Sequence, residues 1–309
     1  MHALISTMKA YKLIAHLALF VVALIYGANY YIAKSVMPQP IGASGFIFLR
    51  VVGATLLFWL IYLFHRERID KSDWWRFAVC GLTGVAVNQL FFFKGLELTS
   101  LSNASIIMTT NPIMVLIMSA FMLKVKPDKR KKTGVFLGAL GAILLIVLSN
   151  SVEVSSGSVL GDLFILINAL SYAVYLVLVK PLMVKYNPLT VITLVFTIGM
   201  VFVFPFGFES ARSISWDNFT TWQWFSVGFV IVATTFLAYL LNIFALARVT
   251  PTQASTYIYL QPVMAIFFAW VFSKILNESY HSEITPLKVI SALLIFVGIY
   301  LVSVENRKK

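Results

Sequence analysis

The chain has 309 residues, of which 60% are hydrophobic and 12% charged, and its mean hydropathy is +0.89. This composition excludes a soluble globular domain, and no hydrophilic stretch is long enough to add one. The formal net charge of +12 does not indicate nucleic-acid binding, because the basic residues lie between apolar runs. Cys80 is the sole cysteine, which excludes internal disulfides and cysteine-rich metal sites.

Ten apolar segments follow one another, and their length predicts membrane-spanning helices. The strands of a membrane β-barrel are shorter and alternate apolar with polar residues, so a barrel is excluded. The first segment follows Lys9 and Lys12 and is too long for a signal peptide, so we expect it to be retained. The segments are 13–36, 41–64, 74–98, 103–124, 133–150, 158–180, 188–208, 222–247, 252–274 and 286–304.

Lysine and arginine divide unequally between the two sides of this predicted bundle. Apart from Arg50 and Lys94, which lie at least one helical turn from the ends of their segments, eighteen lie on one side and four on the other. Six of the eighteen are in the run 124–132, which either contacts anionic headgroups of membrane lipids or is only a solvated loop. Because such an excess marks the cytoplasmic side, both termini are predicted to be cytoplasmic.

The stretch 95–124 returns 150 positions later as 245–274. In each copy an amide precedes a proline near the middle of a helix: Asn111-Pro112 and Gln261-Pro262. Proline lacks a backbone N–H and crowds the carbonyl four residues earlier. The aligned identities pair Leu96, Ala104, Ser105, Pro112, Met114 and Lys124 with Leu246, Ala254, Ser255, Pro262, Met264 and Lys274.

These prolines should loosen the carbonyls of Met108 and Ile258. Matched broken helices in two repeats indicate a transporter's binding site, although ordinary proline kinks are the alternative. Five segments per half is an odd number, so equivalent helices cross the membrane in opposite directions. The sequence therefore predicts ten transmembrane helices in two inverted five-helix repeats, residues 1–151 and 152–309.

Three motifs in this order carry a family resemblance: Tyr26-Gly27-Ala28-Asn29, Leu49-Arg50, and the repeated Ala-Ser…Pro pattern. With them the chain resembles the drug/metabolite transporter superfamily, in its EamA-type branch of two five-helix repeats. The resemblance implies a central cavity lined by segments one to four and six to nine. A glutamate often follows the fourth and ninth helices of that family. Glu278 corresponds to it only loosely, and the first half has no counterpart.

Polar residues at helical spacing should face inward, because a lipid-facing surface needs none. Their amides and phenols suit a small polar solute with an apolar or aromatic part, and hydrogen bonding between helices is the alternative. The candidate substrate-binding residues are Asn29, Arg50, Asn88, Asn111, Tyr172, Tyr175, Tyr239, Asn242, Tyr257 and Gln261, with Pro112 and Pro262 as helix breaks.

Charged residues inside the segments need partners. An unpaired Arg50 near mid-membrane would cost about 2.5–3.5 kcal/mol or more. Its partner is either a substrate carboxylate or a set of backbone carbonyls. Glu97 is expected to pair with Lys94. Because no titrating group falls at mid-membrane, the sequence predicts exchange that does not require a proton gradient.

The sequence thus predicts a secondary, non-ATP transporter of the bacterial inner membrane, working by alternating access. Its expected cargo is a small organic metabolite, an amino acid in particular, and its expected partners are this solute and membrane lipids. No catalytic motif, metal site, cofactor or nucleic-acid partner is predicted. Gly134, Gly138 and Gly141 permit close helix contact within the half or in a homodimer, so the chain is a monomer or a homodimer. The alternative is an integral membrane enzyme acting on a lipid-linked substrate.

Overall fold

The computed structural model is helical wherever the chain is described, and no strand occurs in those residues. Seven of its helices are long and apolar enough to cross a membrane, while Asn111–Met122 and Val289–Ser303 are apolar but shorter. The all-helical membrane class is therefore confirmed, and ten spans remain a prediction. The described residues are 2–34, 36, 40–64, 67–99, 104, 107–124, 126–149, 159–276 and 286–304.

The helices fall into two sets that repeat the same order along the chain. The expected boundary near residue 151 lies outside the described residues and remains a prediction. The first set is α1 (His2–Lys34), α2 (Ala43–Tyr62), α3 (Trp74–Gly81), α4 (Asn88–Leu98), α6 (Asn111–Met122) and α7 (Lys129–Ser149). The second set is α8 (Val159–Lys185), α9 (Pro188–Arg212), α10 (Thr221–Phe229), α11 (Ala238–Leu246), α12 (Pro251–Thr256), α13 (Gln261–Leu276) and α14 (Pro286–Ser303).

The third span of each half contains a π-helical segment. In the first half η2 (Leu82–Val87) joins α3 to α4, and in the second η4 (Val230–Leu237) joins α10 to α11. A π-turn holds more residues than an α-turn, is rare, and frequently occurs at functional sites. The two segments therefore redirect the helix faces that follow them, at matching places in both halves. Short 3₁₀ segments, η1 (Lys71–Asp73) and η3 (Trp216–Asn218), precede these two spans.

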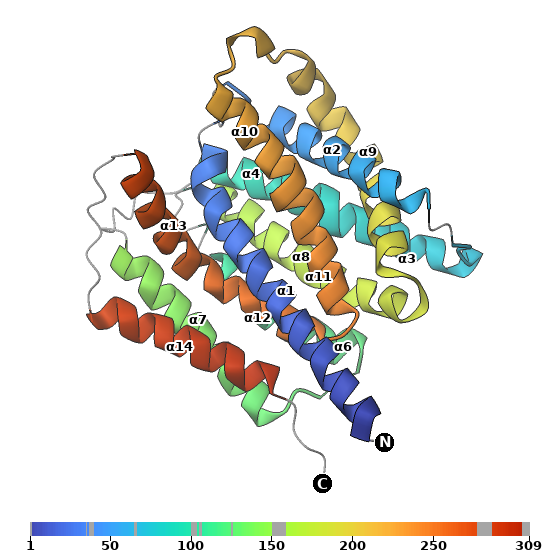
Figure 1. The fold of residues 1–309 in the computed structure, drawn as a ribbon, viewed down its shortest axis with the longest axis vertical. Coiled ribbons are helices and arrows are strands. Elements are labelled where there is room, and N and C mark those ends of the chain that lie inside the picture. Colours follow the sequence, from blue (N-terminus) through green and yellow to red (C-terminus); the bar gives the residue numbers. More distant parts are fainter. Residues whose placement is uncertain are drawn as a thin grey trace.

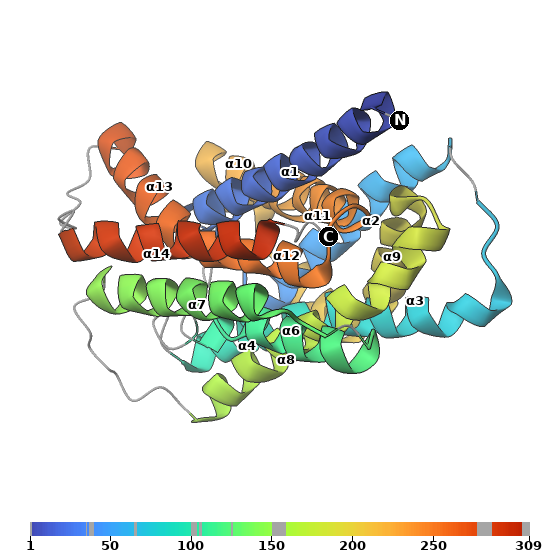
Figure 2. The same ribbon diagram turned by 90° about the horizontal axis from the view of Figure 1, so that it is seen from below.

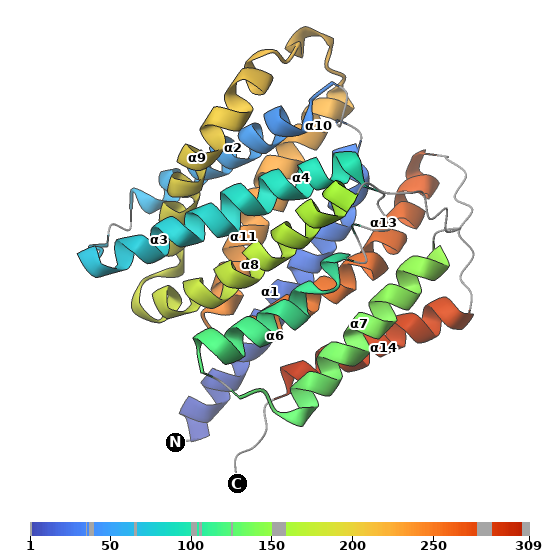
Figure 3. The same cartoon turned by 180° about the vertical axis from the view of Figure 1, so that it is seen from behind.

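The packing pairs of one half return, exchanged, in the other. Helix α8 packs against α4 and α6 of the first half, just as α1 packs against α11 and α13 of the second. The pairs α2·α9 and α7·α14 map onto themselves under this exchange. Figures 1 and 3 show opposite faces of the bundle, with α1, α10 and α11 in front in one and α3, α4 and α8 in front in the other. The two halves are thus related by an approximate two-fold exchange.

Both predicted helix breaks are present, but they differ in form. Helix α6 begins at Asn111, which puts Pro112 in its first turn after a turn at 109–110. Pro112 therefore costs no hydrogen bond within α6, and residues 104, 107 and 108 before the turn are also helical. In the second half η5 (Tyr257–Leu260) separates α12 from α13, and the Ile258 carbonyl accepts from the Gln261 N–H.

The glycines of α7 make close contact with the opposite half. A Cβ on Gly134 would lie 2.8 Å from the carbonyl oxygen of Gly298, and one on Gly141 would lie 2.6 Å from that of Ser291. Figure 2 shows α7 and α14 side by side. The expectation that these glycines serve contacts within their half or in a dimer is thus wrong, because they join the first half to the second.

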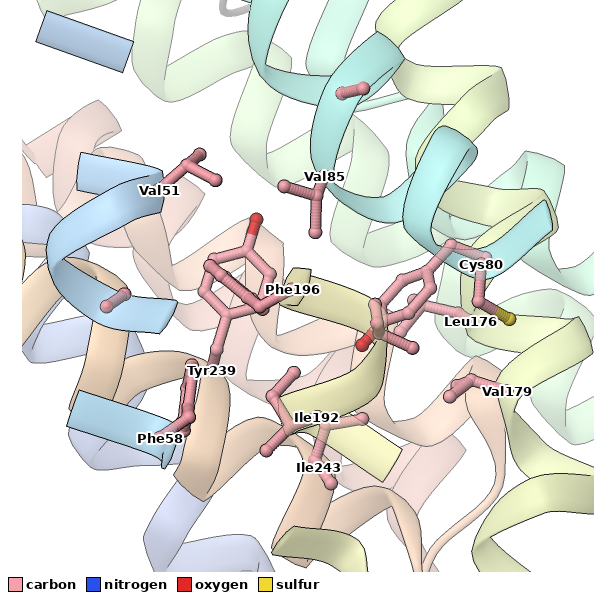
Figure 4. Close-up of a cluster of buried hydrophobic side chains, with 14 of the residues drawn as sticks. Val51, Phe58, Cys80, Val85, Leu176, Val179, Ile192, Phe196, Tyr239 and Ile243 are labelled. Carbon is pink, nitrogen blue, oxygen red and sulfur yellow. The ribbon is translucent and has the colours of Figure 1, made fainter. Parts of the chain in front are cut away.

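The main apolar core lies among α2, η2, α8, α9 and α11, where the two halves meet (Figure 4). The Phe196 ring of α9 packs against Phe58 at 5.0 Å and against the edge of Tyr239 at 4.8 Å. Val51, Cys80 and Val179 are fully buried in the same cluster. Tyr239 belongs both to this core and to the lining of the cavity described next, so the core and the cavity meet at α11.

Candidate functional site

A cavity of about 640 Å³ lies between the two halves. It is lined from α1, α2, α4, α8, η4, α11, α12, η5 and α13, together with Met108. Met108 and Ile258, whose carbonyls the prolines were expected to loosen, are both in the wall. Of the ten candidate residues, eight line this cavity: Asn29, Arg50, Asn88, Tyr172, Tyr239, Asn242, Tyr257 and Gln261.

Arg50 is held by aromatic rings and one hydroxyl group. Only 7% of it is exposed, and its guanidinium carbon lies 5.7 Å from the ring centre of Phe46 and 5.4 Å from that of Phe93. Its Nε donates to Thr235 Oγ1 at 3.1 Å. Within the described residues its terminal nitrogens make no hydrogen bond or ion pair. Of the two expected partners, backbone carbonyls do not hold it here.

The π-helical segment η4 prepares the hydroxyl that receives Arg50. Thr235 donates its own proton to the carbonyl of Val230, five residues earlier, at 2.8 Å. A hydroxyl has one donor and two acceptor positions, so this bond turns its lone pairs toward Arg50. The local helix geometry therefore orients the guanidinium, with its remaining donors on the cavity side.

Amides and phenols connect the helices that surround the cavity. Asn242 Nδ2 of α11 donates to the Tyr172 hydroxyl of α8 at 2.8 Å. On the opposite wall, Thr234 donates to Asn29 Oδ1 of α1 at 3.0 Å. Each bond crosses between adjacent helices, so these polar groups hold the wall together and still present atoms to the interior.

Two candidate residues, Asn111 and Tyr175, are not in the lining of this cavity. Asn111 is fully buried, and its Nδ2 donates to the Ala169 carbonyl of α8 at 2.8 Å. Tyr175 is 2% exposed, and its ring fills the space that a side chain on Gly84 would need. Both residues point inward, but toward a neighbouring helix. Helix α9, the seventh predicted segment, also contributes nothing to the cavity wall.

The cavity also contains residues that were not among the ten candidates. Tyr26 belongs to the Tyr26-Gly27-Ala28-Asn29 motif, Asn168 lies one helical turn before the candidate Tyr172, and Gln89 follows the candidate Asn88. Thr234 is adjacent to Thr235, the residue that accepts from Arg50. Glu97 was expected to pair with Lys94, but the ion pairs of the described residues do not include that contact.

Glu97 marks the mouth of the cavity. It is exposed, it lines the cavity, and it lies one residue before the end of α4. Ala33, near the end of α1, and Ala43, at the start of α2, line the same part. At the other extreme Tyr257 closes the wall by bonding to His16 Nδ1 of α1 at 2.9 Å. The cavity therefore reaches the surface at the Glu97 end.

A charged cluster lies at the opposite end, where α3 begins. The carboxylate of Asp73 is nearly buried and binds Lys185 Nζ at 2.6 Å and the Tyr186 hydroxyl at 2.8 Å. Arg76 reaches its other oxygen at 3.2 Å, and Lys185 also pairs with Asp70. These contacts join the first half to the second at the end away from Glu97.

Among the described residues no group of three or more His, Cys, Asp and Glu side chains is placed to hold a metal ion. Ser105 and Glu278, which entered the repeat and motif comparison, lie outside the described residues.

Comparison with known proteins gives consistent matches over most of the chain. The model described as the EamA-like transporter family matches twice, at residues 13–147 and 159–304. An uncharacterized transporter of Archaeoglobus fulgidus is 25% identical over 297 residues, covering 95% of this chain and 98% of the relative. The uncharacterized transporter YyaM of Bacillus subtilis is 26% identical, covering 78% of each chain.

More distant matches agree with these. The protein WALLS ARE THIN 1 of Arabidopsis thaliana is 24% identical, covering 94% of this chain and 82% of the relative. One solved crystal structure superposes with a TM-score of 0.71 at 15% identity, covering 93% of this chain and 96% of that one. At this identity the structural match establishes the fold alone.

Proposed function

The chain belongs to the EamA-like transporter family and is a multi-pass membrane protein, and from this we propose that it carries an amino acid through the central cavity. The proposed mechanism is alternating access, in which the two halves rock about the cavity and expose it to each side in turn. The proposed cellular location is a bacterial inner membrane, with both termini in the cytoplasm.

The charges of the cavity wall carry the proposal for an amino acid. Arg50 and Glu97 are the charged residues of its described lining. One is a cation whose terminal nitrogens have no partner, and the other is a carboxylate at the mouth. A zwitterion presents the opposite pair of charges, and it also relieves the cost of a bare guanidinium within the membrane. The volume of about 640 Å³ lies within the range of small-molecule sites.

The aromatic content of the wall favours a solute with an apolar side chain. Tyr26, Phe92, Phe93, Tyr172 and Tyr257 all line the cavity. Their rings bury apolar surface. The Tyr172 hydroxyl accepts from Asn242 and keeps its own O–H to donate, whereas the Tyr257 hydroxyl is bonded to His16. We therefore place the charged ends of the amino acid toward Arg50 and Glu97, and its side chain against these rings.

The exchanged packing of the two halves supports alternating access. Because α1 and α8 occupy equivalent places, the two halves can exchange their conformations, and the open end then becomes the closed one. In the present conformation the cavity reaches the Glu97 end, and cross-half contacts such as His16 with Tyr257 lie at the other. With the orientation derived from the loop charges, this conformation is open to the outside.

Counterflow in liposomes tests the proposal. Vesicles with purified protein are loaded with one unlabelled amino acid at a time, and uptake of the same labelled compound is measured. We expect transient accumulation for at least one amino acid, and its loss in Arg50→Met. Thr190→Val, in a fully buried part of α9 away from the cavity, should retain transport. If folded wild-type protein shows no counterflow of any amino acid, the proposal is wrong.

A further inference from the structure

We propose that Gln89 and Arg50 together form a carboxylate subsite, and that Gln89 is the residue that makes it selective for an acid over the corresponding amide. This inference rests on the proposed function and specifies how the cargo is recognised. It starts from a side chain that no sequence motif distinguished.

Gln89 is a buried amide whose hydrogen-bonding capacity the protein does not fill. Only 3% of it is exposed, and it lines the cavity. Neither Oε1 nor Nε2 meets full hydrogen-bond geometry within the described residues, although the Tyr239 hydroxyl lies next to the amide. Buried side-chain amides are nearly always hydrogen-bonded, and an exception calls for a specific reason. At the wall of a cavity, a ligand that completes those bonds is such a reason.

Gln89 and Arg50 face the same part of the cavity. Gln89 lies one turn before Phe93 on α4, so the two side chains share one face of the helix. The Arg50 guanidinium carbon is 5.4 Å from the centre of that Phe93 ring, and α2 packs directly against α4. The π-helical segment η2 ends at Val87 and sets the direction of this face.

The two side chains offer complementary donors to one carboxylate. Arg50 uses Nε for Thr235 and has its terminal nitrogens left, and Gln89 adds two N–H donors. A carboxylate only accepts hydrogen bonds, so both of its oxygens can be satisfied between them. A primary amide in its place carries no charge for Arg50 and offers only one acceptor oxygen to these donors. Arg50 alone would attract any anion, and the Nε2 donors of Gln89 favour a ligand with a second acceptor oxygen.

Binding measurements on full-length protein in detergent test this assignment. Thermal-shift titrations against the standard amino acids identify the strongest wild-type ligand, and its primary amide is then titrated in parallel. We expect the wild type to prefer the acid. Gln89→Leu should weaken acid binding roughly tenfold or more, as for a hydrogen bond to a charged group, and weaken amide binding less, because that bond involves no charge. Gln89→Glu should remove the preference for the acid, because its carboxylate pairs with Arg50.

Thr190→Val is the matched control. Thr190 is also fully buried with an unpaired oxygen, but it lies outside the cavity, so the acid-to-amide ratio should not change. An unchanged ratio in Gln89→Leu would refute the subsite while leaving the transport function intact. If the wild type binds no amino acid, the proposed cargo and the subsite both fail. Should Gln89→Leu not fold, the acid-to-amide binding ratio is measured in Gln89→Asn and Gln89→Glu instead.

Discussion

Asn111 and Gln261 occupy matching positions in the repeat, yet the structure gives them different surroundings, and alanine substitution tests the difference. Asn111 is fully buried, donates to the Ala169 carbonyl at 2.8 Å and lies outside the cavity. Gln261 is half-buried and lines the cavity. We expect Asn111→Ala to lower stability without changing substrate affinity, and Gln261→Ala to weaken affinity.

The magnitudes follow from the bonds each variant removes. Hydrogen bonds between membrane helices contribute about 0.6 kcal/mol on average and about 1.7 kcal/mol at most. Asn111 Oδ1 has no partner, so removing it offsets part of the lost bond. The net loss for Asn111→Ala is therefore about 1 kcal/mol of unfolding free energy. Losing one substrate contact at Gln261 costs about 0.5–1.5 kcal/mol, which is up to roughly tenfold in affinity.

The assay is reversible unfolding in mixed micelles for stability, with ligand titration or transport half-saturation for affinity. Both variants are compared with the wild type in the same preparation. An Asn111→Ala protein of wild-type stability that binds substrate tenfold more weakly would refute the placement of Asn111 outside the site. Asn111 would then contact the substrate, as its position in the repeat suggests, and the packing seen here would not explain its role.

Three further predictions concern packing, orientation and energy coupling. A Cβ on Gly84 would lie 2.4 Å from the buried Tyr175 ring, so Gly84→Ala should lower the free energy of unfolding by about 1–3 kcal/mol. A Cβ on Gly228 would have nothing within 4 Å, so Gly228→Ala should not destabilise the protein. Equal stabilities of the two variants would contradict this packing. With Cys80→Ser as background, a cysteine at Lys129 should react with an impermeant reagent only from the cytoplasm and one at Val159 only from outside, and the reverse pattern would overturn the orientation. Counterflow should proceed at equal pH, and substrate accumulation that is driven by a proton gradient and lost in Glu97→Gln would show that Glu97 couples transport to protons.

Helical periodicity predicted which residues face inward but not what they meet there. Tyr172 and Tyr175 lie three residues apart on α8, on faces that differ by about 60°. Tyr172 reaches the cavity, whereas Tyr175 packs where Gly84 leaves room on η2. That outcome depends on a glycine almost a hundred residues away in the sequence. An inward-facing stripe therefore indicates burial, and the neighbouring helix decides between packing and the site.

The repeat predicted the helix breaks, and long-range packing determined their consequences. The two copies match at Pro112 and Pro262, but one break is a turn before a short helix and the other a 3₁₀ segment. The π-helical segments were not predicted, because they change the 3.6-residue period on which the prediction relied. The sequence predicted that Arg50 needs a partner but not which one. Its partner is the hydroxyl of Thr235, whose position depends on the π-helical segment η4.

The cluster around Asp73 has a kinetic consequence for a carrier of this design. The ion pairs of the described residues all lie at that end, whereas the residue before α10, the counterpart of α3, is the uncharged Thr220. The two end states are then unequal in free energy, and the empty protein rests mainly in the one that the ion pairs hold. Microscopic reversibility still forbids a net gradient without an energy source. Half-saturation, however, differs between the two faces of the membrane, because apparent affinity scales with the fraction of molecules open to that face. At low solute concentration the two directions still run at equal rates per unit of concentration, because the ratio of maximal rate to half-saturation is the same at both faces of a passive carrier. The asymmetry therefore appears near saturation, where the face with the weaker half-saturation has the larger maximal rate.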